Sequence, residues 1–312
     1  MPSMNQLTEK PWLKPLALAS AAALVLTACG DDNGDDEDSA EAEAEVETQV
    51  EIDAEVDTLE EGVLQVCSDV PYPPFEYYDA DGNVVGFDID IATAISDALG
   101  LELEIIESSW DGIESGVALN AQDCDLAISG MTITEERAGN MLFSEPYLDD
   151  NLGLLATADS GITSTDDLDD VPVGVQAATT GHDYAQDELG LDDVTQYEDS
   201  GLMLQGLEAG QVEAIVGNIS IIGYQAGDDE RFEFVEEIDT GEQLGIAAQL
   251  DNQELIDAVD QVLAELEESG ALQEIEQAWF HSETPEEGDE DGGDDEEAED
   301  AEETDDADDD GY

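Results

Sequence analysis

The strongest constraint on this chain is its charge. Its 312 residues include 86 Asp and Glu but only 4 Lys and Arg, so the formal net charge is −82 at pH 7. Self-repulsion of this size destabilises a compact state in dilute buffer, and molar salt, with a screening length of roughly 3 Å, largely removes it. Because the acids are spread over the whole chain, we expect a halophilic protein adapted to concentrated brine. The alternative is an ordinary acidic surface protein from a moderate habitat.

The scarcity of cations also limits the possible partners. Binding to nucleic acid requires clustered Lys and Arg, which this sequence lacks, so a nucleic-acid partner is excluded. Electrostatic docking on anionic lipid is disfavoured for the same reason.

The N-terminal segment has the features of an export signal. Two Lys precede an apolar run from Leu16 to Ala28 that is too short to span a bilayer comfortably. The run ends in Leu26-Thr27-Ala28-Cys29, which resembles the lipobox of bacterial lipoproteins. We predict a lipoprotein signal peptide over residues 1–28 and an acylated Cys29 that tethers the protein to the outer face of the cytoplasmic membrane, at the cell surface or in the periplasm. An ordinary signal peptide with a coincidental Cys is the alternative.

Two acidic segments flank a central part of different composition. Residues 29–61 and 283–312 are rich in Asp and Glu and have few large apolar side chains, so they bury too little surface to offset the cost of chain ordering. We predict a disordered linker and a disordered tail. Acidic runs can hold calcium, but neither segment shows the fixed spacing of an ion-binding loop.

Residues 62–282 alternate between strand-like and helix-like patterns. This order predicts an α/β fold of doubly wound, parallel sheets covered by helices on both faces. Strands are expected at 63–66, 101–106, 126–129, 152–155, 171–175, 212–216 and 244–248, and helices at 91–99, after 110, up to about 188, at 202–209 and from 255 to 279.

Once the leader is removed, Arg137 and Arg231 are the only Lys or Arg side chains left in the sequence. Arg137 closely follows the buried-strand pattern at Leu126–Ser129. Because a guanidinium offers a planar fork of donors that matches a carboxylate, we interpret Arg137 as the anchor for an anionic group of a small ligand. A salt bridge to one of the protein's own acids is the alternative.

The three cysteines fit an exported protein. With Cys29 assigned to lipid, Cys67 and Cys124 remain, and a doubly wound sheet can place them side by side. We predict a disulfide between them, with two buried thiols as the alternative. No metal site is expected, because His182 and His281 lie far from this pair in the sequence.

Six motifs, in order and at compatible spacing, resemble the bacterial extracellular solute-binding proteins of family 3, which serve polar amino-acid ABC importers. Together they cover nearly all of residues 62–282. The motifs are Ser68-Asp69 with Pro71-Tyr72-Pro73-Pro74-Phe75-Glu76, Gly86-Phe87-Asp88-Ile89-Asp90, Trp110-Asp111-Gly112, Asp125 to Arg137, Phe143-Ser144-Glu145-Pro146-Tyr147, and Val173-Gly174-Val175 leading to Thr179-Thr180-Gly181.

This resemblance implies a two-lobe fold of the type II periplasmic-binding-protein kind, with two crossover strands joining the lobes. Lobe 1 would comprise residues 62–150 and 246–282, and lobe 2 would comprise residues 151–245. The ligand would bind in the cleft as the lobes close on it.

The resemblance also implies how lobe 1 would hold the ligand carboxylate. Arg137 would bind it directly. Ser129, Gly130 and Thr132 would line the site beside it, with the Thr132 hydroxyl and backbone N–H groups sharing the polar contacts.

Four further residues would complete the implied site. Thr179 and Thr180, at a helix N-terminus in lobe 2, would present N–H groups to the same carboxylate. Tyr72 and Trp110 would sandwich the ligand's side chain. The alternatives are that Tyr72 packs the proline-rich loop and that Trp110 caps the core.

One position departs from the family pattern. Asn218 stands where the family usually has an Asp that pairs with the α-ammonium group, and an amide accepts a hydrogen bond without supplying the charge. A compatible solute or related zwitterion is therefore an alternative to a free amino acid. Asp69 would bind a cationic side chain or, equally, serve the turn that contains it.

The implied function is capture of a polar amino acid for an ABC transporter permease. The protein would be a monomer anchored by its lipid, with no catalysis, cofactor or metal. An enzyme on the same scaffold, such as a dehydratase, would need a nucleophile and a base, and only His182 offers itself. A sensor domain is a third possibility, disfavoured by the lipobox and by the absence of a fused signalling segment.

The charge imbalance predicts that folding depends on salt. Dialysis from molar to millimolar sodium chloride should lower the melting temperature followed by circular dichroism, because screening of the acidic surface is lost. An unchanged melting temperature would contradict the adaptation to brine.

Overall fold

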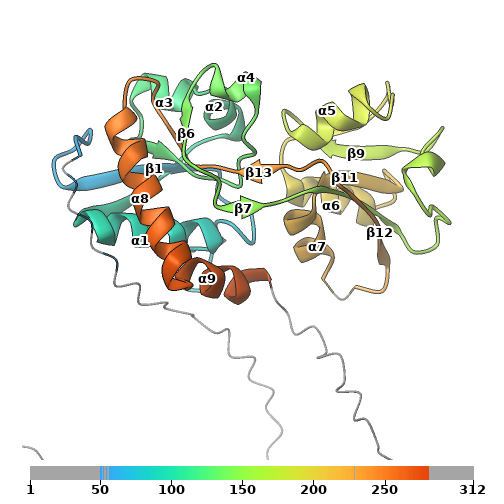
Figure 1. Ribbon diagram of the computed structural model, residues 1–312. Coiled ribbons are helices and arrows are strands. Elements are labelled where there is room, and N and C mark those ends of the chain that lie inside the picture. Colours follow the sequence, from blue (N-terminus) through green and yellow to red (C-terminus); the bar gives the residue numbers. More distant parts are fainter. Residues whose placement is uncertain (1–49, 51, 53, 55, 228, 281–312) are drawn as a thin grey trace, which may run out of the picture. The chain divides into compact units, whose positions relative to one another are not determined.

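The computed structural model describes residues 50, 52, 54, 56–227 and 229–280. In this part of the chain, two five-stranded sheets with their helices form the two α/β lobes that the sequence predicts (Figure 1). The strand order is β4-β1-β5-β14-β6 in the first sheet and β10-β9-β11-β8-β12 in the second. The predicted signal peptide, Cys29, much of the predicted linker and the predicted tail lie outside the described residues.

The first lobe contains the elements up to β6 and the last ones of the described chain. They are β1 (Val63–Ser68), β2 (Tyr77–Tyr78), β3 (Val84–Val85), α1 (Phe87–Leu99), β4 (Glu102–Glu107), α2 (Trp110–Glu114), α3 (Val117–Ala121), β5 (Leu126–Ala127), α4 (Glu135–Ala138), β6 (Leu142–Phe143), β14 (Ala247–Ala248), α8 (Gln253–Ser269) and α9 (Ala271–Phe280).

The second lobe and the two crossover strands supply the remaining elements. They are β7 (Leu148–Asp149), β8 (Leu152–Thr157), the 3-10 turn η1 (Thr165–Asp167), β9 (Val173–Gln176), α5 (Thr180–Asp187), β10 (Thr195–Tyr197), α6 (Ser200–Glu208), β11 (Ala214–Asn218), α7 (Ile219–Ala226), β12 (Phe232–Ile238) and β13 (Gln243–Leu244).

Side-chain alternation along the strands explains why helices cover both faces of the first sheet. Successive side chains of a strand point to opposite faces. Val66 and Leu126 belong to a core shared with α1, α8 and α9, whereas their neighbours Cys67 and Ala127 belong to a second core with α2 and α3. Both faces are apolar, so the sheet needs a helical layer on each side.

The second sheet follows the same rule. Leu154 and Val216 lie in a core that includes Ala185 of α5, whereas the adjacent Leu155 and Ile215 pack with α6 and α7. The strands therefore read as continuous apolar runs, which is typical of sheets buried on both faces.

The expectation of parallel sheets is correct for the pairings among three strands of each sheet and wrong for the pairings made by β14 and β8. β4, β1 and β5 run parallel, as do β10, β9 and β11. β14 is antiparallel to β5 and β6, and β8 is antiparallel to β11 and β12. A parallel pair needs a long crossover connection, usually a helix, and the chain reaches β8 and β14 directly from the other lobe without one.

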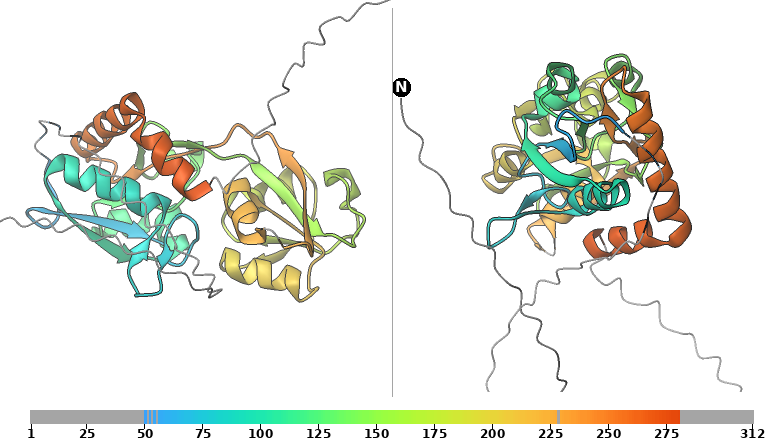
Figure 2. Two further views of the ribbon diagram at one scale, coloured as in Figure 1. Left: turned by 90° about the horizontal axis from the view of Figure 1, so that it is seen from below. Right: turned by 90° about the vertical axis from the view of Figure 1, so that its left-hand side faces the viewer.

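The chain passes between the lobes through β7 and β13, which pair with each other in antiparallel fashion. The single strand predicted at 244–248 is divided into β13 and β14 at Gly245, where an added Cβ would lie 2.7 Å from the side chain of Ile133. After β14, helices α8 and α9 pack beside α1 of the first lobe (Figure 2).

The predicted linker, residues 29–61, is wrong at its C-terminal end. Val50, Ile52 and Val56 pack against the core of the first lobe, and the amide of Ile52 donates to the carbonyl of Ala98 at 3.3 Å. Apolar residues recur at even spacing here, so an extended chain places them on one side, facing the core. These residues belong to the folded lobe rather than to a free spacer.

The predicted disulfide is present in the structure. Cys67 on β1 and Cys124, just before β5, are bonded, with their Cα atoms 5.7 Å apart. Neighbouring strands bring them together, since β1 pairs with β5 in parallel.

Among the described residues, no helix is both long enough and apolar enough to cross a bilayer.

Candidate ligand-binding site

Arg137 is buried and contacts both lobes. It lies on the short helix α4, which begins after Thr134, whose hydroxyl accepts from the Arg137 amide at 3.1 Å. The guanidinium Nη1 donates to the carbonyl of Thr132 at 2.9 Å, and Nη2 donates to the carbonyl of Ala178, in the second lobe, at 3.2 Å. Each terminal nitrogen carries two hydrogens, so one on each remains available to an anion.

Trp110 joins the same contact. It is the first residue of α2, and its indole N–H donates to the carbonyl of Ala178 at 3.0 Å. The guanidinium carbon of Arg137 lies 5.0 Å from the centre of the Trp110 ring, within range of a cation–π attraction. Ala178 has a φ of 58°, which is uncommon for a residue with a side chain, and two donors from the first lobe hold its carbonyl.

The alternative role of Arg137, a salt bridge to one of the protein's own acids, is present in the part of the chain that the structure describes only as one long contact. Its ion pair among the described residues is with Glu114, at 4.0 Å from Nε. Burial lowers the pKa of the guanidinium, and the charges of Glu114 and Glu242 act against that shift. By contrast, Arg231 is 61% exposed and pairs at the surface with Asp229 and Glu208. Of the two arginines in the described residues, Arg137 is therefore the buried one, and it lies where the two lobes meet.

Glu242, which the sequence did not single out, links the two lobes from the crossover. It directly precedes β13, and its Oε2 accepts hydrogen bonds from the Thr132 hydroxyl at 3.0 Å and from the Thr180 hydroxyl at 2.7 Å. Thr132 belongs to the first lobe and Thr180 to the second. We refer to Trp110, Thr132, Arg137, Ala178, Thr180 and Glu242 as the inter-lobe site.

The N-terminus of α5 faces this group. Thr179 caps the helix, accepting from the His182 amide at 3.3 Å and donating its own hydroxyl to the Gln176 carbonyl at 2.8 Å. The first turn of a helix leaves N–H groups without helical partners and carries partial positive charge, so Thr180 and Gly181 present donors suited to an anion. Thr179 acts here as a cap rather than as a free hydroxyl.

Ser129 differs from the expectation. Its hydroxyl donates to the buried carboxyl of Glu76 and accepts from the amide of Asp69 at 3.2 Å. The side chain is therefore occupied by internal partners and supports the loop instead of lining the site. Ser129 lies just beyond β5 and is fully buried, so its hydroxyl has no exposed surface.

Gly130 and Tyr72 pack against each other below the site. Gly130 has a φ of 50°, and a Cβ there would lie 3.1 Å from the Tyr72 ring. Tyr72 is buried and stacks on Phe75, with ring centres 5.9 Å apart and an interplanar angle of 18°. The packing role left open for Tyr72 is thus present, and its contact with a ligand stays a prediction.

Two further buried carboxylates, Asp88 and Asp150, flank the inter-lobe site. Asp88 accepts from the Gly130 amide at 2.7 Å and from the Tyr147 hydroxyl at 2.9 Å, and burial raises its pKa to about 7. Asp150 accepts from the hydroxyl and the amide of Ser220 at 2.6 and 3.1 Å, and burial raises its pKa to about 7 as well.

Asn218 is the last residue of β11. Its side-chain Nδ2 donates a hydrogen bond to the carbonyl of Asp150 at 3.2 Å, and Asp150 lies where the chain crosses between the lobes.

Asp69 stands among other acids. Burial raises its pKa to about 6, and the charges of Asp199 and Glu198 in the second lobe and of Asp111 in the first add to this shift, while a hydrogen bond from the Trp110 amide opposes it. A bound organic cation would relieve the repulsion at Asp69.

Within residues 56–227 and 229–280, no group of His, Cys, Asp and Glu has the arrangement of a metal site.

Comparison with known proteins shows the family of the chain. Residues 64–282 match the bacterial extracellular solute-binding proteins, family 3. The chain belongs to this family. It is 33% identical to the arginine-binding periplasmic protein of Mannheimia haemolytica over 67% of this chain and 87% of that protein. It is 29% identical to the L-cystine-binding protein TcyJ of Escherichia coli K12 over 71% of this chain and 84% of that protein.

A solved structure supports the same assignment. An ancestral arginine-binding protein bound to arginine superposes with a TM-score of 0.65 and 32% identity, over 70% of this chain and 99% of that one. The family consists of binding proteins, and this member is a solute-binding protein rather than an enzyme.

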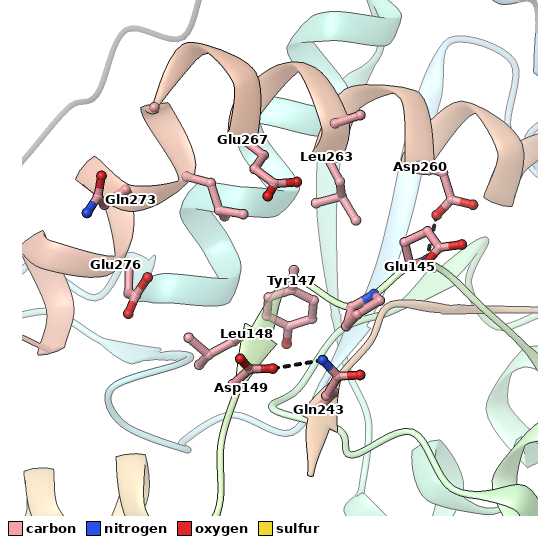
Figure 3. Close-up of a pocket in the computed structure, with 14 residues that line it drawn as sticks. Glu145, Tyr147, Leu148, Asp149, Gln243, Asp260, Leu263, Glu267, Gln273 and Glu276 are labelled. Carbon is pink, nitrogen blue, oxygen red and sulfur yellow. Dashed lines mark hydrogen bonds between the residues drawn. The ribbon is translucent and has the colours of Figure 1, made fainter. Parts of the chain in front are cut away.

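A separate hollow of about 700 Å³ lies at the crossover strands (Figure 3). Residues of β7, β13, α8 and α9 line it, and Asp149 accepts there from the side-chain amide of Gln243 at 2.8 Å. The residues predicted to bind the ligand do not line it. The hollow therefore borders the connection between the lobes and is distinct from the inter-lobe site.

The buried carboxyls give the solute-binding protein a definite dependence on pH. Asp88 and Asp150 have a pKa of about 7 in the fold against an ordinary value of 3.8, and burial together with Asp88 holds the pKa of Glu76 well above its usual range. Between about pH 4 and 7 the folded state binds more protons than the unfolded state, so the free energy of unfolding should fall as pH rises.

The variant Asp88→Asn, studied in molar salt, tests whether the buried carboxyls cause this pH dependence. The variant should lose part of the slope, up to about 1.4 kcal/mol per pH unit for one proton, in urea unfolding measured from pH 4 to 8. Asp97→Asn, on the exposed face of the same helix, is the matched control and should keep the wild-type slope. Equal slopes in all three proteins would show that general charge repulsion, rather than burial of Asp88, sets the pH dependence.

Proposed function

We propose that this solute-binding protein captures a cationic amino acid of the arginine type outside the cytoplasmic membrane and delivers it to the permease of an ABC importer. It would act as a monomer held at the membrane by lipid on Cys29. The observation that carries the proposal is that opposite charges lie in different places around the inter-lobe site. The positive charge is the buried guanidinium of Arg137, and the negative charge is the group of acidic side chains around Asp69.

Arg137 and its neighbours suit the acid end of the ligand. Its two available hydrogens, the Thr132 and Thr180 hydroxyls and the first N–H groups of α5 are all donors. Charge-assisted hydrogen bonds from a guanidinium are stronger than neutral ones, and the second lobe adds its donors only when the lobes approach each other. Binding of the carboxylate would thus favour closure.

Asp69 suits the side-chain end. Asp111 from the first lobe and Glu198 and Asp199 from the second raise its pKa together with burial, and no Lys or Arg acts among the causes of this shift. A guanidinium or ammonium would replace this repulsion by attraction. The Trp110 ring already lies against the guanidinium of Arg137, and an aromatic face of this kind supports a cationic ligand.

The relatives support this class without deciding it. Arginine-binding proteins occur among both the sequence and the structural matches, and an L-cystine-binding protein matches at similar identity. The alternatives are another polar amino acid, or a compatible solute or related zwitterion. Each of these ligands would place its carboxylate on Arg137 but would bring no positive charge to the acids around Asp69. For this reason we favour a cationic amino acid.

A ligand panel in molar salt tests the class. At equal concentration, L-arginine, L-lysine and L-ornithine should raise the melting temperature more than L-glutamine, L-cystine or glycine betaine, since a ligand that binds more tightly stabilises the fold more. Asp69→Asn should weaken arginine binding by roughly 10-fold or more in calorimetry and leave any glutamine binding unchanged. Asp97→Asn is the charge-matched control. Stronger binding of betaine or glutamine than of arginine would contradict the proposal.

Substitution of Arg137 tests the acid end. Arg137→Ala should weaken binding by about 2–5 kcal/mol, because the ligand carboxylate loses its charged partner. Arg137→Lys keeps the charge but not the fork, and should recover only part of the affinity. Circular dichroism checks that both variants fold. Wild-type affinity in the Ala variant would rule out this role of Arg137.

A further inference from the structure

Glu242 occupies the place that the proposed function gives to a ligand carboxylate. Its Oε2 takes the hydroxyl hydrogens of Thr132 and Thr180, one from each lobe, and its charge acts on Arg137. An acid in this position repels the carboxylate that the surrounding donors attract. An amino-acid ligand resolves the conflict, because it carries a cation next to its carboxylate.

We propose that Glu242 receives the α-ammonium group of the ligand. The inference rests on the proposed function, in that the ligand must be an α-amino acid. It assigns the recognition of the zwitterion to a pair of side chains, Arg137 for the negative end and Glu242 for the positive end.

The backbone fixes Glu242 beside the loop that carries Thr132. The carbonyl of Glu242 accepts from the Asp150 amide at 3.0 Å, and the next carbonyl, that of Gln243, accepts from the Ile133 amide at 2.8 Å. Thr132 itself bridges to Leu244. The backbone of Glu242 is thus held beside Thr132 by contacts on both sides.

The other acids near the site are less suited to an ammonium. Asp150 is buried and already accepts two hydrogen bonds from Ser220, and Glu114 is the ion-pair partner of Arg137. Asn218 has no charge, and its Nδ2 donates to the Asp150 carbonyl. Glu242 is half-buried, and both of its side-chain hydrogen bonds end on Oε2, so Oε1 is open.

Ligand binding would then be an exchange of hydrogen bonds. An ammonium group has three donors and replaces the two hydroxyls at Glu242. The released hydroxyls of Thr132 and Thr180 turn to the ligand carboxylate, which also meets Arg137. The Glu242 carboxylate and the two Thr hydroxyls thus have hydrogen-bond partners before and after binding, and the ligand takes over the link between the lobes that Glu242 provides without it.

The test compares two ligands that differ only in the α-amino group. Calorimetry in molar salt uses the full mature chain with L-arginine and with 5-guanidinopentanoic acid, its deaminated analogue. Glu242→Gln should weaken arginine binding by roughly 10- to 100-fold. The same substitution should leave the analogue unchanged or improve its binding, because the analogue has no ammonium to lose and one repulsion is removed.

Glu213→Gln is the matched control. Glu213 is exposed just before β11, at the opposite end of that strand from Asn218, and its substitution removes one negative charge without touching the inter-lobe site. It should bind both ligands as the wild type does.

Several outcomes would overturn the assignment. Equal weakening of both ligands by Glu242→Gln would give Glu242 a structural role, and unchanged arginine binding would remove it from recognition. Tighter arginine binding would make Glu242 an internal competitor of the ligand carboxylate.

The two proposals fail in different ways. If the wild type binds another amino acid but none of L-arginine, L-lysine and L-ornithine, the cationic class is wrong, and the comparison is made with that amino acid and its deaminated acid. If the wild type binds no α-amino acid, both proposals are overturned.

Discussion

A buried guanidinium connects the two lobes, and the arrangement of the site depends on it. Arg137 donates to the Thr132 carbonyl in its own lobe and to the Ala178 carbonyl in the other, and Trp110 lies against it. Desolvation makes an unpaired cation costly, so the structure surrounds this one with carbonyls and keeps acids within electrostatic range. A ligand carboxylate would give Arg137 a closer charged partner than Glu114, which lies 4.0 Å from its Nε.

Part of the acid excess of the chain lies inside the fold, where burial favours the protonated form of a carboxyl. Glu76 and Asp88 lie fully buried beneath the Ser129–Gly130 loop, and burial raises the pKa of both. Ser129 and Gly130 donate to these carboxyls, so the loop beside Arg137 is shaped from below. Around Asp69 several acidic side chains lie close together, and a bound cation would offset their repulsion.

The crossover strands couple this chemistry to the connection between the lobes. Glu242 and Asp150 both lie on the crossovers, bonded to each other through the backbone, and each reaches a hydroxyl of the second lobe, Thr180 or Ser220. A group bound between Arg137 and Glu242 therefore contacts residues that connect the lobes. Differential affinity for the closed arrangement is what a binding protein needs to trap its ligand.

The periodicity of the sequence determined the α/β class and most strands and helices, and its rare residue types pointed to the Cys67–Cys124 pair and to Arg137. The two lobes were implied by the resemblance of its motifs to a known family. The sequence pattern missed α7, whose eight residues with Gly223 are too short for a clear period, and it assigned the segment that contains Val50 to a free linker. Only the tertiary structure decided that Ser129 faces Glu76, that β8 and β14 run antiparallel, and that Glu242, one acid among 86, joins Thr132 to Thr180. Those facts depend on which residues far apart in the chain become neighbours in the fold, and the local sequence pattern does not specify these long-range contacts.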